Sequence, residues 1–153
     1  MVEGEASQSE EITMMETYVQ MSGYVGGPVD HRILASGSSR ASFRIASTPR
    51  RRLENGGWQD GPTTWLTVVC FRQLATHVTS SLQRGDAVVV AGRLRTDRWV
   101  DQQGTQHERL VLQADVVGHD LNRGTSVFHK APRRDLESAD DEQATQTPAS
   151  RAG

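Results

Sequence analysis

Apolar and polar residues alternate with a period of two in three segments of the first half of the chain, a pattern typical of half-buried β-strands. The segments are residues 17–25, about 40–47 and 64–72. The tripeptide Gly26-Gly27-Pro28 follows the first segment and predicts a plain turn, because it belongs to no phosphate-loop motif. Three strands are therefore expected before the middle of the chain.

The second half of the chain begins with a change of period. Apolar residues at helical spacing predict a helix over 73–83, and Arg84-Gly85 supplies its stop. Strand patterns return at 86–94 and 109–117, with a polar hairpin over 95–108 between them. Gly92 predicts a bulge or bend in the fourth strand.

The predicted order is thus three strands, one helix and two further strands. A five-stranded OB-fold barrel has this order, with its helix between strands three and four. Its binding loops join strands one and two and strands four and five. A β-sandwich would need more strands than the sequence supplies. We therefore expect an all-β fold, a five-stranded OB-fold barrel with one helix.

Aromatic residues occupy alternate positions of the third predicted strand. Trp65 and Phe71 share one face, and Leu66, Val68 and Cys70 share the other. Parity alone leaves two interpretations open, since the aromatic face is either the buried core or an exposed platform. A third aromatic residue, Trp99, lies in the polar hairpin, where few neighbours could bury it.

Charge is unevenly distributed along the chain. Residues 1–16 carry five acidic and no basic residues, a charge of −5, and residues 135–153 carry −4. Residues 17–134 hold 16 basic against nine acidic residues, a charge of +7, although the whole chain is −2. We predict a disordered acidic extension at 1–16, an OB-fold domain at 17–121 and a flexible tail at 122–153.

Several classes of protein are not expected from this sequence. The lone Cys70 and five histidines never fall at metal-ligand spacing, so neither a metal nor another cofactor is predicted. No nucleophile lies beside a base and no carboxylates cluster, so the chain is not expected to be an enzyme. No apolar run approaches the roughly 18 residues of a membrane span, and the acidic start is unlike a signal peptide. A cytoplasmic protein is expected.

Four motifs in this order resemble bacterial single-stranded DNA-binding proteins, and the resemblance covers about residues 16–121. The motifs are Phe43-Arg44-Ile45-Ala46-Ser47-Thr48, Thr64-Trp65-Leu66-Thr67-Val68-Val69-Cys70-Phe71, Leu82-Gln83-Arg84-Gly85-Asp86 and Gly92-Arg93-Leu94-Arg95-Thr96-Asp97-Arg98-Trp99. The resemblance implies sequence-independent binding and protection of single-stranded DNA in replication, recombination and repair. It also implies a homotetramer associated with the nucleoid.

The resemblance also implies four base-stacking positions, of which Trp65, Phe71 and Trp99 occupy three. It thereby favours the platform interpretation of the third strand. The fourth position falls within Arg50, Arg51 and Arg52 of a long loop, so an arginine plane or Trp58 of the same loop is the candidate substitute. Phosphate contacts are predicted for the arginines on this face and its loops: Arg44, Arg50, Arg51, Arg52, Arg72, Arg93, Arg95 and Arg98.

The chain departs from the family's main members at its C-terminus. Those members end in an acidic tip whose last residues are apolar and which recruits repair enzymes, whereas this chain ends in TQTPASRAG. It therefore resembles the short-tailed second paralogue of some bacteria, and partner recruitment is not carried over to it. The alternative function is an OB-fold protein-interaction module, such as a primosome-type accessory factor, because OB barrels serve many ligands.

Overall fold

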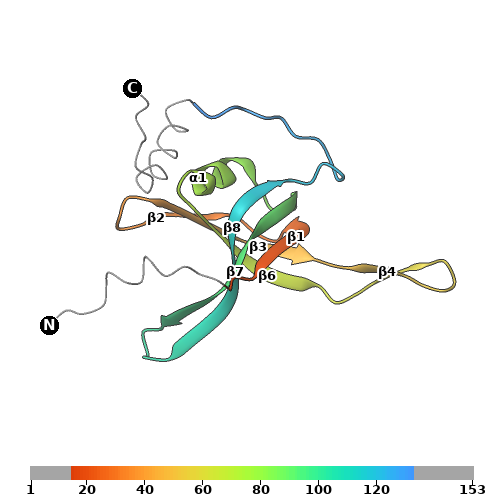
Figure 1. Cartoon of the computed structure of the whole chain (residues 1–153), viewed down its shortest axis with the longest axis horizontal. Helices are drawn as coiled ribbons and strands as arrows, with labels where there is room; N and C mark the ends of the chain where they lie inside the picture. Colours follow the sequence, from red (N-terminus) through yellow and green to blue (C-terminus); the bar gives the residue numbers. More distant parts are fainter. Residues whose placement is uncertain (1–14, 133–153) are drawn as a thin grey trace, which may run out of the picture.

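Five strands of the computed structural model, which describes residues 15–132, pair in a closed cycle (Figure 1). They are β1 (Tyr18–Val25), β3 (Ser39–Ser47), β6 (Thr64–Phe71), β7 (Ala87–Val100) and β8 (Gln106–His119). The cycle runs β1-β7-β8-β6-β3 and returns to β1 through pairing of β3 with the end of β1. β6 and β8 pair in parallel, and the other neighbours are antiparallel. The five-stranded barrel predicted from the sequence is confirmed.

The barrel interior is filled by the apolar residues of each strand's inward face. β3 contributes Ala41, Phe43 and Ile45, and β6 contributes Val68 and Cys70. All five are at most 3% exposed, as the period-two pattern requires of an inward face. Other core residues are Val25, Val88, Val90, Leu112 and Ala114.

One helix, α1 (Arg72–Ser81), lies between the third and fourth barrel strands and covers one end of the barrel (Figure 1). Its Ala75 and Val78 are buried, together with Leu82 just past its end. The predicted helix over 73–83 therefore begins one residue after the observed start and ends two residues after the observed end. Gly85, the predicted stop, takes a φ of 91° in the turn that follows, a conformation that glycine adopts without steric cost.

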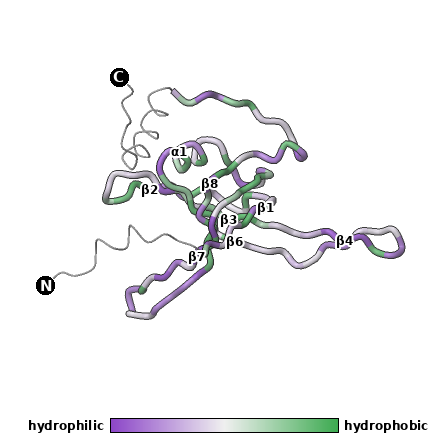
Figure 2. The backbone as a smooth tube through the Cα atoms, in the orientation of Figure 1, coloured by the Kyte–Doolittle hydropathy of each residue, from purple (hydrophilic) through white to green (hydrophobic). Residues whose placement is uncertain are grey.

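The sequence pattern missed three pieces of strand. β2 (Asp30–Ile33) pairs with β3 and is fully exposed, so it shows no alternation. β4 (Arg50–Arg52) and β5 (Trp58–Asp60) form a separate hairpin within the predicted loop. The predicted hairpin over 95–108 is a continuation of β7 and β8, closed by a short turn. Figure 2 shows that this extension is mainly hydrophilic, which explains why apolar periodicity did not reveal it.

Gly92 marks a register shift between β7 and β8, as predicted. Ala91 pairs with Val116 while Gly92 pairs with Ala114, so Asp115 is the extra, bulged residue of β8. A Cβ atom on Gly92 would lie 2.8 Å from Cα of Ala114 and closer still to the carbonyl oxygen of Gln113. Only glycine allows the two strands to approach this closely, and the bulge bends the sheet so that the barrel can close.

Between Asp120 and Pro132 the described chain contains neither helix nor strand. Residues 1–14 and 133–153, which hold most of the predicted acidic tails, lie outside the described residues.

Candidate nucleic-acid interface

The outward faces of β3, β6, β8 and β7 form one continuous surface, which we call the outer face. Strand register places Arg44 beside Thr67, Thr67 beside Val111, and Val111 beside Arg95. Because residues paired across neighbouring strands point to the same side, alternate residues along each strand belong to this surface. Among the predicted residues, it therefore gathers Arg44, Trp65, Phe71, Arg93, Arg95 and Trp99.

Trp65 lies on the outer face and is 49% exposed, whereas Val68 and Cys70, on the inward face of the same strand, are buried. The guanidinium carbon of Arg44 lies 5.0 Å from the centre of the indole ring, within the range of a cation–π contact. One edge of the ring packs against the backbone of Gly26, where a Cβ atom would come within 3.1 Å of the ring atom Cη2. The ring is thus exposed and also fixed in position.

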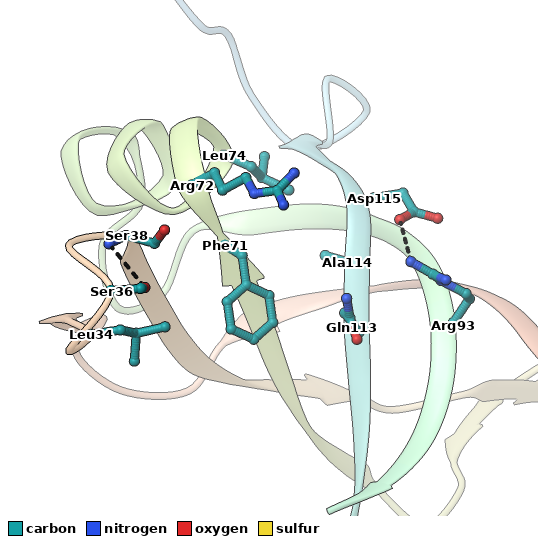
Figure 3. Close-up of a pocket in the computed structure, with 10 residues that line it drawn as sticks. All are labelled: Leu34, Ser36, Ser38, Phe71, Arg72, Leu74, Arg93, Gln113, Ala114 and Asp115. Atoms are coloured by element: carbon teal, nitrogen blue, oxygen red, sulfur yellow. Dashed lines mark hydrogen bonds and ion pairs between the residues drawn. The ribbon is translucent and has the colours of Figure 1, made fainter. Parts of the chain in front are cut away.

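Phe71 lies at the other end of β6 and lines an open cleft of about 770 Å³ (Figure 3). Figure 3 shows Gln113 of β8 between Phe71 and Arg93, so an aromatic ring, an amide and a guanidinium follow one another across the outer face. The turn between β2 and β3 forms the opposite wall with Leu34, Ser36 and Ser38. Such a sequence of ring and polar donors can hold a base and its neighbouring phosphate.

Arg72 also lines this cleft, at the start of α1. The φ of Arg72, 61°, is rare for a residue other than glycine. The strand β6 ends just before this residue, at Phe71, one residue earlier than the sequence pattern predicts.

Trp99 lies near the tip of the β7–β8 extension and is 43% exposed. The ring of His107, its partner across the hairpin, stacks on it with centroids 5.3 Å apart and an angle of 19° between planes. The guanidinium carbon of Arg109 lies 5.3 Å from the centre of the Trp99 ring. Two neighbours therefore contact the indole ring and restrict its position on the hairpin.

The tip of this hairpin is organised by one carboxylate. Asp101 accepts hydrogen bonds from the backbone N–H groups of Gln103 and Thr105, both at 2.9 Å. Its other oxygen lies 2.7 Å from Nε2 of His107. The contact with His107, followed by that with the Thr105 N–H, lowers the pKa of Asp101 from its ordinary value of 3.8. Asp101 thus links the turn to the ring that stacks on Trp99.

Two predicted arginines of the outer face share a carboxylate in the free protein. Oε1 of Glu16 lies 3.3 Å from Nη1 of Arg93 and 3.5 Å from Nη2 of Arg95. Nη2 of Arg93 also lies 3.8 Å from a carboxylate oxygen of Asp115. Nε of Arg93 is buried and, among the described residues, has no hydrogen-bond partner. The positive charge here is partly neutralised by the chain's own acids.

The remaining predicted residues lie away from the outer face. Arg98 alternates with Trp99 and therefore points to the opposite side of the hairpin, where its Nε lies 3.2 Å from Glu108. Trp58, 58% exposed, lies on the β4–β5 hairpin opposite Arg52, with the guanidinium of Arg50 5.6 Å from its ring centre. Arg51 alternates with Arg50 and Arg52 and points to the other side of that hairpin. This hairpin forms a second cluster of one indole and several arginines.

Sequence reasoning missed four residues of the site. Arg40 shares the outer face beside Phe71, and Arg109 and His107 contact Trp99. Once the strand register is known, their positions along β3 and β8 place them on the same face as Phe71 and Trp99. Gly26, interpreted as part of a plain turn, also provides the backbone on which Trp65 packs. No pattern in the sequence indicated that contact.

Other chemistry is not evident in the part of the chain that the structure describes. No group of three or more potential metal ligands occurs among residues 15–132. Burial raises the pKa of the Cys70 thiol to about 12, so this residue is an unreactive part of the core. No helix within the same range is long and apolar enough to span a membrane.

Comparison with known proteins gives consistent matches over this barrel. The model of the single-strand binding protein family matches residues 17–120. Single-stranded DNA-binding protein 2 of Streptomyces avermitilis is 44% identical over 126 residues, which cover 82% of this chain and 78% of the relative. The protein of the same name from Tropheryma whipplei is 37% identical over 114 residues, 74% of each chain.

Solved structures agree with these sequence matches. The crystal structure of a small single-stranded DNA-binding protein from Streptomyces coelicolor superposes with a TM-score of 0.63 at 39% identity, covering 72% of this chain and all of the other. The second single-stranded DNA-binding protein of Mycobacterium smegmatis superposes with a TM-score of 0.57 at 28% identity, covering 76% of this chain and all of the other.

Proposed function

Because this chain belongs to the single-strand binding protein family, we propose that it binds single-stranded DNA, stacking bases on its exposed aromatic rings and contacting phosphates with its arginines. It is a binding protein and not an enzyme. Binding by stacking needs no sequence readout, since every base has a flat face. The function therefore is to cover and protect unpaired strands during replication, recombination and repair.

One observation carries this proposal, namely that two indole rings stand half-exposed on the outer face of a filled barrel. Trp65 and Trp99 are 49% and 43% exposed, although large aromatic side chains are usually well buried. Base–aromatic stacking is known from proteins of this kind to contribute about 1 to 3 kcal/mol per base. Phe71 is proposed as the third stacking ring, at the cleft beside Gln113.

Arginines flank these rings and supply the second part of the binding energy. Arg44, Arg93 and Arg95 share the outer face, and the guanidinium geometry suits both phosphate and flat rings. We propose that the β4–β5 hairpin extends the path, with Trp58 and Arg50 to Arg52 taking the role of the fourth stacking position. Each phosphate contact releases counterions, so affinity should fall as salt rises.

The test is a titration of intrinsic tryptophan fluorescence with oligo-dT and with a duplex of equal length, at two salt concentrations. We expect quenching by oligo-dT at low salt, weaker binding at high salt and little response to the duplex, whose paired bases cannot lie on the rings. Absence of quenching by oligo-dT would refute the proposal. Equal affinity for the duplex would refute the proposal as well, because binding would then depend on the sugar-phosphate backbone of the DNA alone.

We also propose that the chain forms a homotetramer. The outward face of β1 and its neighbours carries apolar side chains that the barrel does not cover, including Tyr24 and Val116, which are 47% and 63% exposed. Exposed apolar side chains on a sheet face are suited to protein contact. Light scattering should give four times the 16.8 kDa of one chain, and a monomeric mass would contradict this proposal alone. A cytoplasmic, nucleoid-associated location follows from the proposed ligand.

A further inference from the structure

One carboxylate of the chain already lies where a DNA phosphate is proposed to bind. Oε1 of Glu16 is 3.3 Å from Nη1 of Arg93 and 3.5 Å from Nη2 of Arg95. Both arginines lie on the outer face, and Arg95 is two residues along β7 from Asp97 and four from Trp99. A carboxylate and a phosphate offer the same kind of anionic oxygen to a guanidinium. Glu16 therefore occupies an anion site within the proposed DNA path.

The backbone directs Glu16 to this site. The N–H of Leu94 donates a hydrogen bond of 2.8 Å to the carbonyl oxygen of Thr17, the next residue along the chain. Tyr18 then pairs with Arg93 in the β1–β7 ladder. Because these contacts fix the chain immediately after Glu16, its side chain is held close to the two arginines. The side chain is only 23% exposed, so water screens the contact less than at an open surface.

The contacts are nevertheless loose enough to be exchanged. Charge-assisted hydrogen bonds between a guanidinium and a carboxylate are usually about 2.7 to 2.9 Å long, whereas those of Glu16 are 3.3 and 3.5 Å. The approach of Asp115 to Arg93, at 3.8 Å, is longer still. Nε of Arg93 is buried without a hydrogen-bond partner among the described residues. The guanidinium of Arg93 is therefore incompletely satisfied, and another anion could replace the carboxylate.

We propose that Glu16 is an internal competitor of DNA, a carboxylate that occupies the Arg93–Arg95 phosphate site until a strand displaces it. This inference rests on the proposed function, because the competition exists only if the outer face binds DNA. A strand prevails because it engages several arginines and rings at once, whereas Glu16 offers one carboxylate to Arg93 and Arg95. Glu16 thus weakens the binding of isolated or short stretches more than that of long ones.

The test compares the full-length chain with E16Q, which keeps the size of the side chain and removes its charge. A matched control is E108Q, because Glu108 also pairs with an arginine, Arg98, at 3.2 Å but on the opposite side of the hairpin. Both variants change the net charge equally. Affinity for a short oligo-dT is measured by fluorescence quenching at low and high salt, and thermal melting verifies the fold.

We expect E16Q to bind about two- to fivefold more tightly at low salt, the effect of removing one partly exposed carboxylate that pairs with two arginines. The gain should shrink as salt rises, because salt screens the contact that Glu16 makes. E108Q should bind as the unaltered chain does. Equal gains for both variants would show an effect of net charge only and would overturn the inference. So would an unchanged or weaker affinity of E16Q, the latter showing that Glu16 positions the arginines for binding.

The outcome also separates this inference from the proposed function. If the unaltered chain quenches with oligo-dT and E16Q gains nothing, the inference fails and the proposed function stands. If neither protein binds oligo-dT at low salt, both fail.

Discussion

The guanidinium carbon of Arg44 lies 5.0 Å from the centre of the Trp65 ring, on neighbouring strands of the outer face. An exposed cation–π contact of this kind contributes about 0.5 to 1 kcal/mol, less than the stacking of one base. The contact can therefore hold the indole ready in the free protein and give way when a base arrives. Arg50 over Trp58 and Arg109 over Trp99 repeat the arrangement, so each indole has an arginine beside its ring.

Replacing Trp65 or Trp99 by alanine should weaken the binding of oligo-dT without unfolding the protein. The expected loss is about 1 to 3 kcal/mol for each ring, or roughly five- to 150-fold in affinity. Melting temperature should change little, because both rings are half-exposed. Phe43, 3% exposed, supplies the contrast. Its alanine variant should lose about 3 to 5 kcal/mol of stability, and a comparable loss in W65A would show that Trp65 is a core residue.

The backbone of Gly26, against which Trp65 packs, should contribute to binding by positioning the ring. Changing Gly26 to alanine places a methyl group against the indole and forces it to move. We expect weaker binding of oligo-dT, by at most the loss seen in W65A, and an altered tryptophan emission spectrum. Gly27 is the matched control, since a Cβ atom there meets nothing within 4 Å. Equal behaviour of G26A and G27A would mean that the contact does not position the ring.

The period-two pattern separated the two faces of the third barrel strand, because a closed barrel covers one face of each strand and leaves the other outside. The family resemblance then indicated which of the two faces is buried. Leu66, Val68 and Cys70 contribute to the core or pack against it, and Trp65 is exposed. The same reasoning could have separated Arg98 from Trp99, since neighbouring residues in a strand point to opposite sides. That step requires knowing that β7 continues to Val100. The sequence pattern did not indicate this continuation, because the hairpin is hydrophilic and has no apolar period.

Contacts between distant segments could not be predicted in this way. Glu16 meets Arg93 across 77 positions of sequence, and Gly26, just after β1, meets Trp65 of β6 across the intervening strand β3. Both depend on how β1 pairs with β7 and β3, and no local pattern encodes that register. β2 escaped detection for another reason, because a strand exposed on both faces has no apolar period.

Arginines on the two sides of the β7–β8 hairpin should differ in their contribution to binding. Arg95 lies on the outer face with Trp99, whereas Arg98 points to the other side and pairs with Glu108. We expect Arg95→Ala to weaken oligo-dT binding and to reduce the slope of log affinity against log salt by about 0.7, one phosphate contact on a single strand. Arg98→Ala should change both much less. A larger loss of affinity in Arg98→Ala than in Arg95→Ala would show that DNA binds on the opposite face of the hairpin.

The bulge at Gly92 should be required for stability. A methyl group there would overlap the backbone of Gln113 and Ala114, so Gly92→Ala is expected to cost about 1 to 3 kcal/mol, as overpacking usually does. Gly118 of β8, which pairs with Val89, is the control, because a methyl group added there would meet nothing within 4 Å. Urea unfolding at one fixed protein concentration measures both variants. Similar midpoints for the two would show that the strands can separate locally at little cost.

The hairpin tip should depend on pH through Asp101. Hydrogen bonds from His107 and from the Thr105 and Gln103 amides lower the pKa of this carboxyl below 3.8 in the folded hairpin. The folded state therefore binds the proton less tightly than the unfolded chain does. Its contribution to stability is complete above pH 3.8 and is lost as the pH falls through the lowered value.

NMR measurement of the Gln103 and Thr105 amide protons should detect this loss, because both donate to the titrating carboxylate of Asp101. In Asp101→Asn the acid transition of these amides should disappear, and Trp99 should be less firmly held at neutral pH, because the turn no longer fixes His107 against its ring. Weaker oligo-dT binding by the variant at neutral pH would link the turn to the stacking site. An acid transition that persists in the variant would assign it to another group and contradict the role of Asp101.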